Sequence, residues 1–308
     1  MTDAENKTRL DGFLPFLLSL IAFSLLLCFP KTVGTGVRAG LELCYRAIIP
    51  SVFPFMVLSE ILRGIDLSPL DFTLGRVFGA IFRVSALGGR VILLGLLCGF
   101  PIGAKMTSEL YADGRMSKRE AERLLFLSSC PSPAFVISGV GISMLNDAAS
   151  GCMLYFILVL SVFTVGLILP SDRTTEPTSS LSHAHRSPSL VGAIKGAGLG
   201  TLSVTAFITF FSVLSALAAS LIPSPAISAL IASVLEIGSG ASAASVLMTH
   251  SPRLASALIG FATAFSGISV YLQSLAYIGE TNLSPRLYLI GKIISGIVSG
   301  ALAMLFLC

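Results

Sequence analysis

The residues with the clearest capacity for chemistry lie in one short stretch, Gly99–Lys105, where two glycines flank a proline inside an apolar run. Proline removes a backbone hydrogen-bond donor and disfavours helix at the preceding residue. Glycine tolerates unusual dihedrals and lets another backbone approach closely. Backbone groups that are freed at membrane depth need partners in protein or in a water-lined cavity. We therefore expect a broken helix here, with Gly99, Pro101 and Gly103 forming part of a site for a small polar ligand.

Two charged residues follow this break on one helix face. Lys105 and Glu109 are separated by four residues, so a helix places them side by side. Each charge costs roughly 2.5–3.5 kcal/mol at the centre of a helix that faces lipid, so the pair should face the bundle interior and the ligand. The alternative is that both side chains extend to the membrane edge and hold the end of the helix there.

A second break is predicted at Ser128–Pro133, where two prolines stand two residues apart. An unbroken helix cannot contain both. The hydroxyl groups of Ser129 and Ser132 either line a ligand site at the tip of a hairpin or satisfy local carbonyl groups at a plain kink.

A third break is predicted around Ser266 and Gly267. Ser269 and Gln273 follow at a spacing of four residues, so a helix presents a hydroxyl and an amide together. These groups either bind the same solute as the first break, or Gln273 bonds a neighbouring helix.

One acidic residue stands alone between two short apolar pieces. Glu236 is the single acid between Glu176 and Glu280. It either binds a cation or proton or caps the N-terminus of the next helix. Glu42 and Arg46, four residues apart, are expected to form a structural ion pair.

Signatures of other chemistry are missing from the sequence. There is no phosphate-binding loop, no H-E-x-x-H and no G-x-S-x-G, and the three histidines lack cysteine or acidic partners at suitable spacing. We therefore expect no enzymatic activity, no cofactor and no metal. The cysteines form no C-x-x-C pair and are expected to be small buried apolar residues; they are Cys28, Cys44, Cys98, Cys130, Cys152 and Cys308.

The composition of the whole chain indicates where these residues must lie. Of 308 residues, 54% are hydrophobic and only 12% are charged, whereas about 25% are charged in an ordinary soluble domain. This excludes a soluble enzyme. The net charge of +4, without a basic run, argues against nucleic acid as a partner. The sequence predicts a polytopic, all-α helical membrane protein whose constant partner is the lipid bilayer.

Since a helix needs about 20 residues to cross a membrane, we expect about eight to ten membrane-embedded helical segments, several of them broken or re-entrant. The expected organisation is an N-terminal transmembrane helix within 1–34, a first repeat over 35–170, a flexible polar linker over 171–190 and a second repeat over 191–308.

The two repeats are predicted from an internal match. Gly99–Tyr111 aligns with Phe265–Tyr277 at one constant offset, and one inserted residue later Ser117 aligns with Ser284. Ser117 begins a capping box and Ser284 precedes Pro285, so both serines are expected to be helix N-caps. Repeated halves with interrupted helices are typical of transporters. The basic joint before Ser117 favours a cytoplasmic position for that loop.

The first motif also resembles a known family. Gly99–Lys105, followed by Ser117–Leu125, resembles the YlbJ-type sporulation integral membrane proteins of the nucleoside-recognition, or Gate-domain, group. Those proteins typically show G-[YF]-P-x-G-A-K and then a helix with an E-x-x-R-L-L-like run. Ser266–Val270 with Gln273 resembles their C-terminal motif. The likeness covers roughly 35–308. It departs at Ser128–Pro133, where the family usually has asparagines.

This resemblance implies a multi-pass, gate-like protein of the bacterial inner membrane that is associated with spore formation. It implies a permease for a small polar solute, with nucleosides and ions as the candidates. The alternative is a membrane scaffold that is required in spore formation and transports nothing. The identity of the solute, the direction of transport and the oligomeric state stay open at this point.

Overall fold

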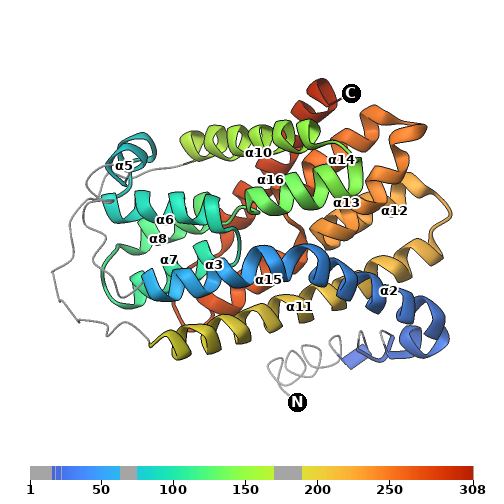
Figure 1. Cartoon of the computed structure of the whole chain (residues 1–308), viewed down its shortest axis with the longest axis horizontal. Helices are drawn as coiled ribbons and strands as arrows, with labels where there is room; N and C mark the ends of the chain where they lie inside the picture. The colour runs from blue at the N-terminus through green and yellow to red at the C-terminus, as the bar shows by residue number, and fades with distance from the viewer. Residues whose placement is uncertain (1–15, 18, 22, 63–74, 170–188, 308) are drawn as a thin grey trace, which may run out of the picture.

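The computed structural model describes the chain outside residues 1–15, 18, 22, 63–74, 170–188 and 308. Within these described residues every regular element is helical, as the composition predicts (Figure 1). Most of the predicted linker and much of the predicted N-terminal helix lie outside the described residues. The division into related halves stays a prediction.

The first helical run is unbroken from Pro30 to Leu62. It consists of α2 (Pro30–Leu43), a π-helical turn η1 (Cys44–Ile48) and α3 (Ile49–Leu62). The run packs along α11 (Leu190–Leu221), in the opposite direction (Figure 1).

The remaining elements before the polar linker are mostly short. They are α5 (Arg76–Phe82), α6 (Ala86–Cys98), α7 (Ile102–Ala112), α8 (Lys118–Ser128), the π-helical η3 (Phe135–Ile142), α9 (Ser143–Leu145) and α10 (Ala148–Ile168). After α11 come α12 (Pro225–Leu235), α13 (Ile237–Ser245), the 3-10 turn η4 (Val246–Thr249), α14 (Pro252–Phe265), α15 (Gly267–Ile278) and α16 (Arg286–Phe306).

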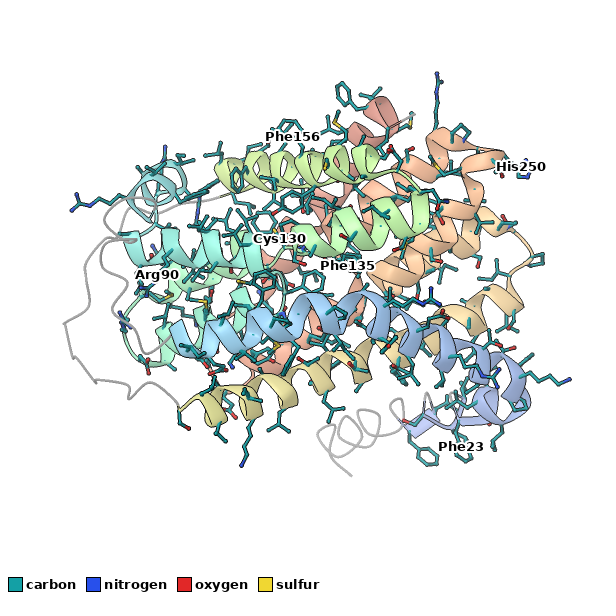
Figure 2. All side chains as sticks on the ribbon, viewed as in Figure 1. Phe23, Arg90, Cys130, Phe135, Phe156 and His250 are labelled. Atoms are coloured by element: carbon teal, nitrogen blue, oxygen red, sulfur yellow. The ribbon has the colours of Figure 1, made fainter. Side chains whose placement is uncertain are left out.

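Among the described residues, four helical stretches are long and apolar enough to cross a membrane: α10, α11, α14 with α15, and α16. Two pairs bent by 97°, Ser19–Cys28 with Pro30–Ile48 and α5 with α6, raise this number to six if each pair is one span. Four further apolar helices have 10–17 residues and are too short to cross alone: Val52–Ile61, Phe135–Leu145, Pro225–Leu235 and Ile237–Thr249. The predicted eight to ten membrane-embedded segments included such broken or re-entrant pieces. Large outward side chains such as Phe23 and Phe156 suit contact with lipid (Figure 2).

The predicted start of α8 is confirmed. The Ser117 hydroxyl accepts from the Glu120 amide at 3.2 Å. The Glu120 carboxylate does not complete the capping box; it accepts from the Ser85 amide at 2.7 Å, at the start of α6. One carboxylate thus joins two helix N-termini.

The predicted start of the last helix is wrong by one residue. Pro285, and not Ser284, occupies the N-cap of α16. The Ser284 amide donates instead to the Glu122 carboxylate at 2.8 Å, which fixes the chain before α16 against α8.

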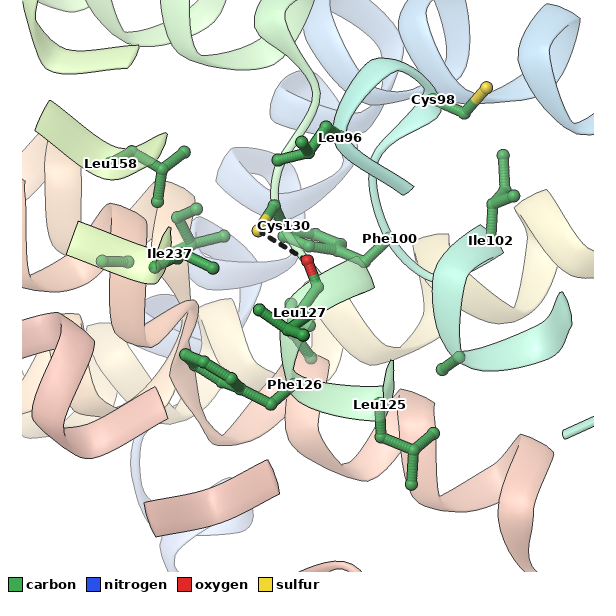
Figure 3. Close-up of a cluster of buried hydrophobic side chains, with 14 of the residues drawn as sticks. Leu96, Cys98, Phe100, Ile102, Leu125, Phe126, Leu127, Cys130, Leu158 and Ile237 are labelled. Carbon is green, nitrogen blue, oxygen red and sulfur yellow. Dashed lines mark hydrogen bonds between the residues drawn. The ribbon is translucent and has the colours of Figure 1, made fainter. Parts of the chain in front are cut away.

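The core is centred on α8. Leu125, Phe126 and Leu127 are fully buried, and they lie close to Phe100 and Cys130 (Figure 3). The first turn of α8 is exposed at Lys118 and Arg119, whereas its second half, from Arg123 to Ser128, is buried on all sides, which suits the middle of a large apolar bundle.

The cysteine prediction holds in part. Cys44, Cys98 and Cys130 are buried, but Cys28 and Cys152 are exposed on helices whose outer faces are apolar. The prediction was wrong for these two because a lipid-facing position accepts an apolar side chain as readily as a core does. Cys308 lies outside the described residues.

Candidate functional site

Four helix breaks in the described part of the chain carry most of the predicted site residues. They separate α6 from α7 at Gly99–Pro101, α8 from η3 at Ser129–Pro133, α12 from α13 at Glu236, and α14 from α15 at Ser266. The sequence predicts each of these interruptions. The structure also shows which of them meet.

The first break touches the second. Gly99 ends α6 with φ of 80°, in the region that favours glycine. A Cβ atom on Gly99 would lie 2.7 Å from the Ser132 nitrogen. The Phe100–Pro101 peptide bond is cis, and the Pro101 carbonyl accepts from the Lys105 amide at 3.0 Å to begin α7. The two backbones are therefore in direct contact.

Gly103 has a packing role in this arrangement. A Cβ atom there would overlap the Ser128 carbonyl oxygen, and the same carbonyl would meet a Cβ atom on Gly95. The end of α8 thus lies between α6 and α7. Gly103 permits that close approach, and its part in ligand binding stays a prediction.

The fourth break touches the third in a similar way. Ser266 and Gly267 have φ of 72° and 81°. A Cβ atom on Gly267 would lie 2.9 Å from the Glu236 Cα atom and 3.0 Å from the Leu235 oxygen. The start of α15 is therefore packed directly against the junction of α12 and α13.

Glu236 caps the helix that follows it, which was one of its two predicted roles. Its side chain is fully buried, and its carboxylate accepts from the Gly238 amide at 2.9 Å and the Ser239 amide at 2.6 Å. Both oxygen atoms are thus bonded by the N-terminus of α13. This geometry stabilises a negative charge at the positive end of a helix.

Lys292 lies on α16, which connects the two pairs of breaks. Its side chain is buried, and Nζ donates to the Ala264 carbonyl and to the Ser266 hydroxyl, both at 3.2 Å. The helix that carries Lys292 also packs against α8, which ends at the second break, because a Cβ atom on Gly291 would lie 2.5 Å from the Phe126 ring. Sequence reasoning did not propose Lys292 as a site residue. The available signal was that it is the single charge beyond the first turn of the last helix.

One turn before Lys292, Tyr288 makes a second connection. Its hydroxyl lies 3.1 Å from the Ser274 hydroxyl, and its ring stacks on Tyr271 at 5.6 Å between centroids. Ser129 of the second break lies close to the same hydroxyl group. We refer to Ser129, Ser266, Ser274, Tyr288 and Lys292 as the central polar cluster.

Gln273 lies next to this cluster in sequence and is 2% exposed. Its Nε2 atom donates to the Ser269 hydroxyl at 3.2 Å, so the predicted pairing of amide and hydroxyl is present. Its Oε1 atom is buried and has no hydrogen-bond partner among the described residues. A buried acceptor without a partner is costly, so this atom can accept a hydrogen bond from a bound donor.

Lys105 lies apart from the central polar cluster. Its ammonium forms an ion pair with Glu60 of α3, and Glu109 also interacts with it electrostatically. Glu60 in turn lies beside Gly196, next to Lys195 and close to the start of α11. Since α11 is a candidate span, this position favours the predicted alternative at the membrane edge. We refer to Glu60, Lys105 and Glu109 as the edge charge cluster.

Within the described residues, no three His, Cys, Asp or Glu side chains gather in a way that could hold a metal ion. The polar side chains at the breaks contact backbone ends and one another. Such an arrangement can offer hydrogen bonds to a bound molecule. The expectations of no enzymatic activity and no cofactor stay predictions.

Comparison with known proteins gives one clear relationship. The chain is 26% identical to the sporulation integral membrane protein YlbJ of Bacillus subtilis (strain 168), over an alignment of 343 residues that includes 97% of this chain and 84% of the relative. No family model and no solved structure matches the chain. The chain is a multi-pass integral membrane protein that is homologous to a bacterial membrane protein of sporulation.

Proposed function

From this relationship to a sporulation protein, we propose that the chain is a gate-like permease that binds a small polar solute between its broken helices. Four breaks meet in two pairs; Lys292 of α16 bonds the fourth break, and α16 packs against α8, which ends at the second break. Interrupted helices near the middle of a bundle are the usual binding sites of transporters, because they expose backbone ends that a solute can bond. A role during spore formation is proposed from the printed name of the relative.

The observation that carries this proposal is the buried Oε1 atom of Gln273, which has no partner among the described residues. It accepts hydrogen bonds, so the proposed solute carries N–H or O–H donors. A nucleoside-like compound offers both kinds of donor. The site residues proposed at the breaks are Gly99, Pro101, Ser129, Ser132, Glu236, Ser266, Gly267, Ser269 and Gln273, with Gly103 as a packing residue.

We further propose that the two halves of the chain are related. The break between α6 and α7 aligns with the break between α14 and α15, and both have positive φ, at Gly99 and at Ser266. Each broken helix leads through a short polar connection to a further helix, α8 or α16. The N-cap of α8 is the predicted Ser117, and the N-cap of α16 is Pro285, one residue after the predicted Ser284.

The first test is a thermal-shift screen of the protein, purified in detergent, against nucleosides, nucleobases and small polar acids. A ligand that binds only the native state at a hundredfold excess over its Kd stabilises it by about 2.7 kcal/mol. We expect a shift that is lost in Gln273→Leu and kept in Lys105→Met, because Lys105 lies in the edge charge cluster. A shift lost only in Lys105→Met would move the site to that cluster.

A second candidate function is a membrane scaffold, and the buried charges favour it in one respect. Glu236 and Lys292 are bonded by the protein's own groups and need no ligand. This alternative predicts no shift across the panel and no solute uptake by proteoliposomes, while Gln273→Leu still changes the unfolding midpoint. Uptake that is lost in Gln273→Leu would exclude the scaffold.

A further inference from the structure

The short helix α5 lies across the direction of the membrane spans. The Ser85 amide at the start of α6 is bonded by a carboxylate in the first turn of α8. In the next turn of α8, Arg123 donates to the Leu169 carbonyl at the end of α10, at 3.0 Å. Near the other end of α6, the Leu96 carbonyl accepts from the Tyr155 hydroxyl in the first half of α10, at 3.1 Å. α6 therefore runs antiparallel to α10, and α5, which is bent by 97° from α6, lies across both of them (Figure 1).

The depth of α5 in the membrane follows from its contacts with α10. The 21 residues of α10 give a length of about 32 Å, close to the roughly 30 Å hydrocarbon core, so the end of α10 lies near one membrane surface. The rings of Phe78 and Phe82 in α5 pack edge-on against the Phe163 ring, at 6.0 and 4.8 Å between centroids. Phe163 precedes Leu169 by six residues, which is about 9 Å along a helix. Interfacial helices bury their apolar face by about 5–10 Å at such a boundary, so α5 lies at the depth of the interface.

The sequence of α5 places apolar and basic side chains on different faces. The two phenylalanines face α10, and the next face around the helix carries Val77 and Ile81, which are 54% and 48% exposed and suit contact with lipid. Arg76 and Arg83 are separated by seven residues, so they share a face on the side away from the phenylalanines. Both arginines are exposed. This separation is that of a helix that lies in the plane of the interface.

The end of the molecule that carries α5 is basic. Among the described residues, six exposed lysines and arginines lie at the two ends of α5, in the joint before α8, in the first turn of α8 and at the start of α16; they are Arg76, Arg83, Arg115, Lys118, Arg119 and Arg286. The connections before α8 and α16 also expose the acids Asp113 and Glu280. The opposite end, where α2, α10 and α14 begin, exposes Lys31, Asp147 and Arg253. An excess of basic residues near the ends of spans indicates the cytoplasmic side of a membrane protein.

We propose that α5 is an interfacial helix on the cytoplasmic side of the membrane and that Arg76 and Arg83 bind the phosphate groups of anionic phospholipids. The guanidinium group of arginine bonds two phosphate oxygens at once. Residues 75–85 contain both arginines and no acid, so the helix itself is positively charged, and the anionic lipids of the cytoplasmic leaflet attract such a segment. The bent pair of α5 and α6 is then a surface helix followed by an inserted helix, and not one span. This inference is independent of any solute that the chain binds.

The first test measures the depth of α5. The sequence contains no tryptophan, so a single introduced tryptophan reports its own surroundings. Ile81→Trp is reconstituted in vesicles of phosphatidylcholine that carries bromine either close to the headgroup or close to the chain ends. We expect stronger quenching of the fluorescence by bromine close to the headgroup. The matched control is Phe156→Trp, which is 62% exposed near the middle of α10 and should show the reverse order (Figure 2). The same order at both positions overturns the proposal.

The second test measures lipid selectivity with the Ile81→Trp protein, in equal mixtures of phosphatidylglycerol and phosphatidylcholine in which one or the other is brominated. We expect a preference for phosphatidylglycerol that falls about fivefold in Arg76→Gln and in Arg83→Gln, the change that about 1 kcal/mol per basic residue produces. Lys31→Gln and Arg253→Gln, at the opposite end, are the matched controls and should keep the preference. Each variant should also keep the depth order of its parent, which shows that α5 has stayed in place.

Three results of the selectivity test overturn the proposal. They are the absence of a preference, an equal loss in the controls, and a preference that glycerol 3-phosphate removes while sodium chloride of the same ionic strength does not. The last result would assign the basic face of α5 to a soluble phosphate compound.

The third test determines the side of the membrane. Ala112→Cys, at the end of α7, is introduced in a chain whose Cys28, Cys152 and Cys308 are replaced by serine, and an impermeant maleimide is added to vesicles of known orientation. We expect labelling in inside-out vesicles and none in right-side-out vesicles. Ser251→Cys, before α14 at the opposite end, should show the reverse. Labelling of position 112 from the outer side overturns the proposal.

Discussion

At the scale of single residues, the buried charges match the helix ends that they contact. The Glu236 carboxylate lies at the N-terminus of α13, and the Lys292 ammonium bonds a carbonyl at the C-terminal end of α14. The helix dipole favours an anion at the first position and a cation at the second. Each charge thus has a structural function whether or not a solute binds nearby.

The contact between the third and fourth breaks depends on a residue without a side chain. Gly267→Ala places a residue with a side chain where the backbone φ is positive, a conformation that favours glycine. The new Cβ atom would also lie within 3.0 Å of the Glu236 backbone. We expect a loss of about 1–3 kcal/mol in the free energy of unfolding. The measurement is denaturant unfolding in detergent.

The matched control for this substitution is Gly198→Ala in α11. No atom lies within 4 Å of a Cβ at Gly198, and alanine in a helix stabilises by about 0.5–1 kcal/mol relative to glycine. If both variants shift the free energy of unfolding equally, the close contact at Gly267 is not important for stability.

At the scale of elements, the breaks were predictable from the sequence and their partners were not. Proline, glycine and serine disturb a helix through local geometry, so the interruptions at 99–101 and 129–133 are visible in the chain alone. The sequence placed Lys105 and Glu109 on one face of α7 but did not indicate Glu60, with which Lys105 forms its ion pair. That partner depends on the packing of α3 against α7, which no local pattern encodes.

Local rules also failed once within an element. Pro54 lies inside α3, although proline is a strong helix breaker. The π-helical turn η1 precedes α3, and such turns alter the backbone bonding of a helix locally. The helix nevertheless continues through Pro54, where it packs along α11.

The packing of α2 on α11 gives the next prediction. Gly40→Leu places a large side chain against the Thr209 backbone, so we expect a loss of about 1–3 kcal/mol from overpacking. Gly34→Leu in the same helix is the matched control, because no atom lies within 4 Å of a Cβ there. Thermal unfolding in detergent distinguishes the two. Equal midpoints would mean that α2 packs differently.

The N-cap of α10 gives a pH dependence. The Ser150 hydroxyl and the amides of Ser150 and Ala149 donate to the Asp147 carboxylate, which lowers its pKa below the usual range. The stabilisation is therefore fully present above the unfolded-state pKa, about 3.9, and is lost as the pH falls through the lower folded-state pKa.

The variant that tests this pH dependence is Asp147→Asn. We expect it to lower the unfolding midpoint relative to wild type at about pH 7. The difference should shrink at about pH 3, because below about pH 3.9 the unfolded state of the wild type protonates Asp147 before the folded state does. A difference that stays constant between these two pH values would show that the charge of Asp147 does not contribute.

At the scale of the whole molecule, the two predicted halves interlock instead of packing as separate units. The Ser108 hydroxyl of α7 donates to the Tyr277 carbonyl of α15 at 2.7 Å, and Tyr111 bonds Asn282 at 2.5 Å. The first contact joins the two segments that align in the sequence, Gly99–Tyr111 and Phe265–Tyr277, and the second joins the end of the first segment to the connection after α15. A motion of one half against the other would have to break them.

Substitutions in the edge charge cluster test whether transport requires such a motion. Lys105 and Glu60 are mostly buried, with side-chain exposures of 19% and 7%. Removal of one partner from a buried ion pair typically costs 3–5 kcal/mol, and we expect about 3 kcal/mol here because Lys105 retains some contact with water. We therefore expect Lys105→Met and Glu60→Gln each to lower the free energy of unfolding substantially, and the double variant to lower it by clearly less than their sum.

A double-mutant cycle of unfolding free energies measures this coupling, with Glu109→Gln as the control that leaves the Glu60 pair intact. Additive losses would contradict the pair.

The same variants separate the two candidate functions. A gate that opens by breaking the pair should transport at a changed rate in the double variant, whose loss of stability is smaller than the sum of the single losses. A scaffold should show the coupling in the free energy of unfolding but no solute uptake in any variant.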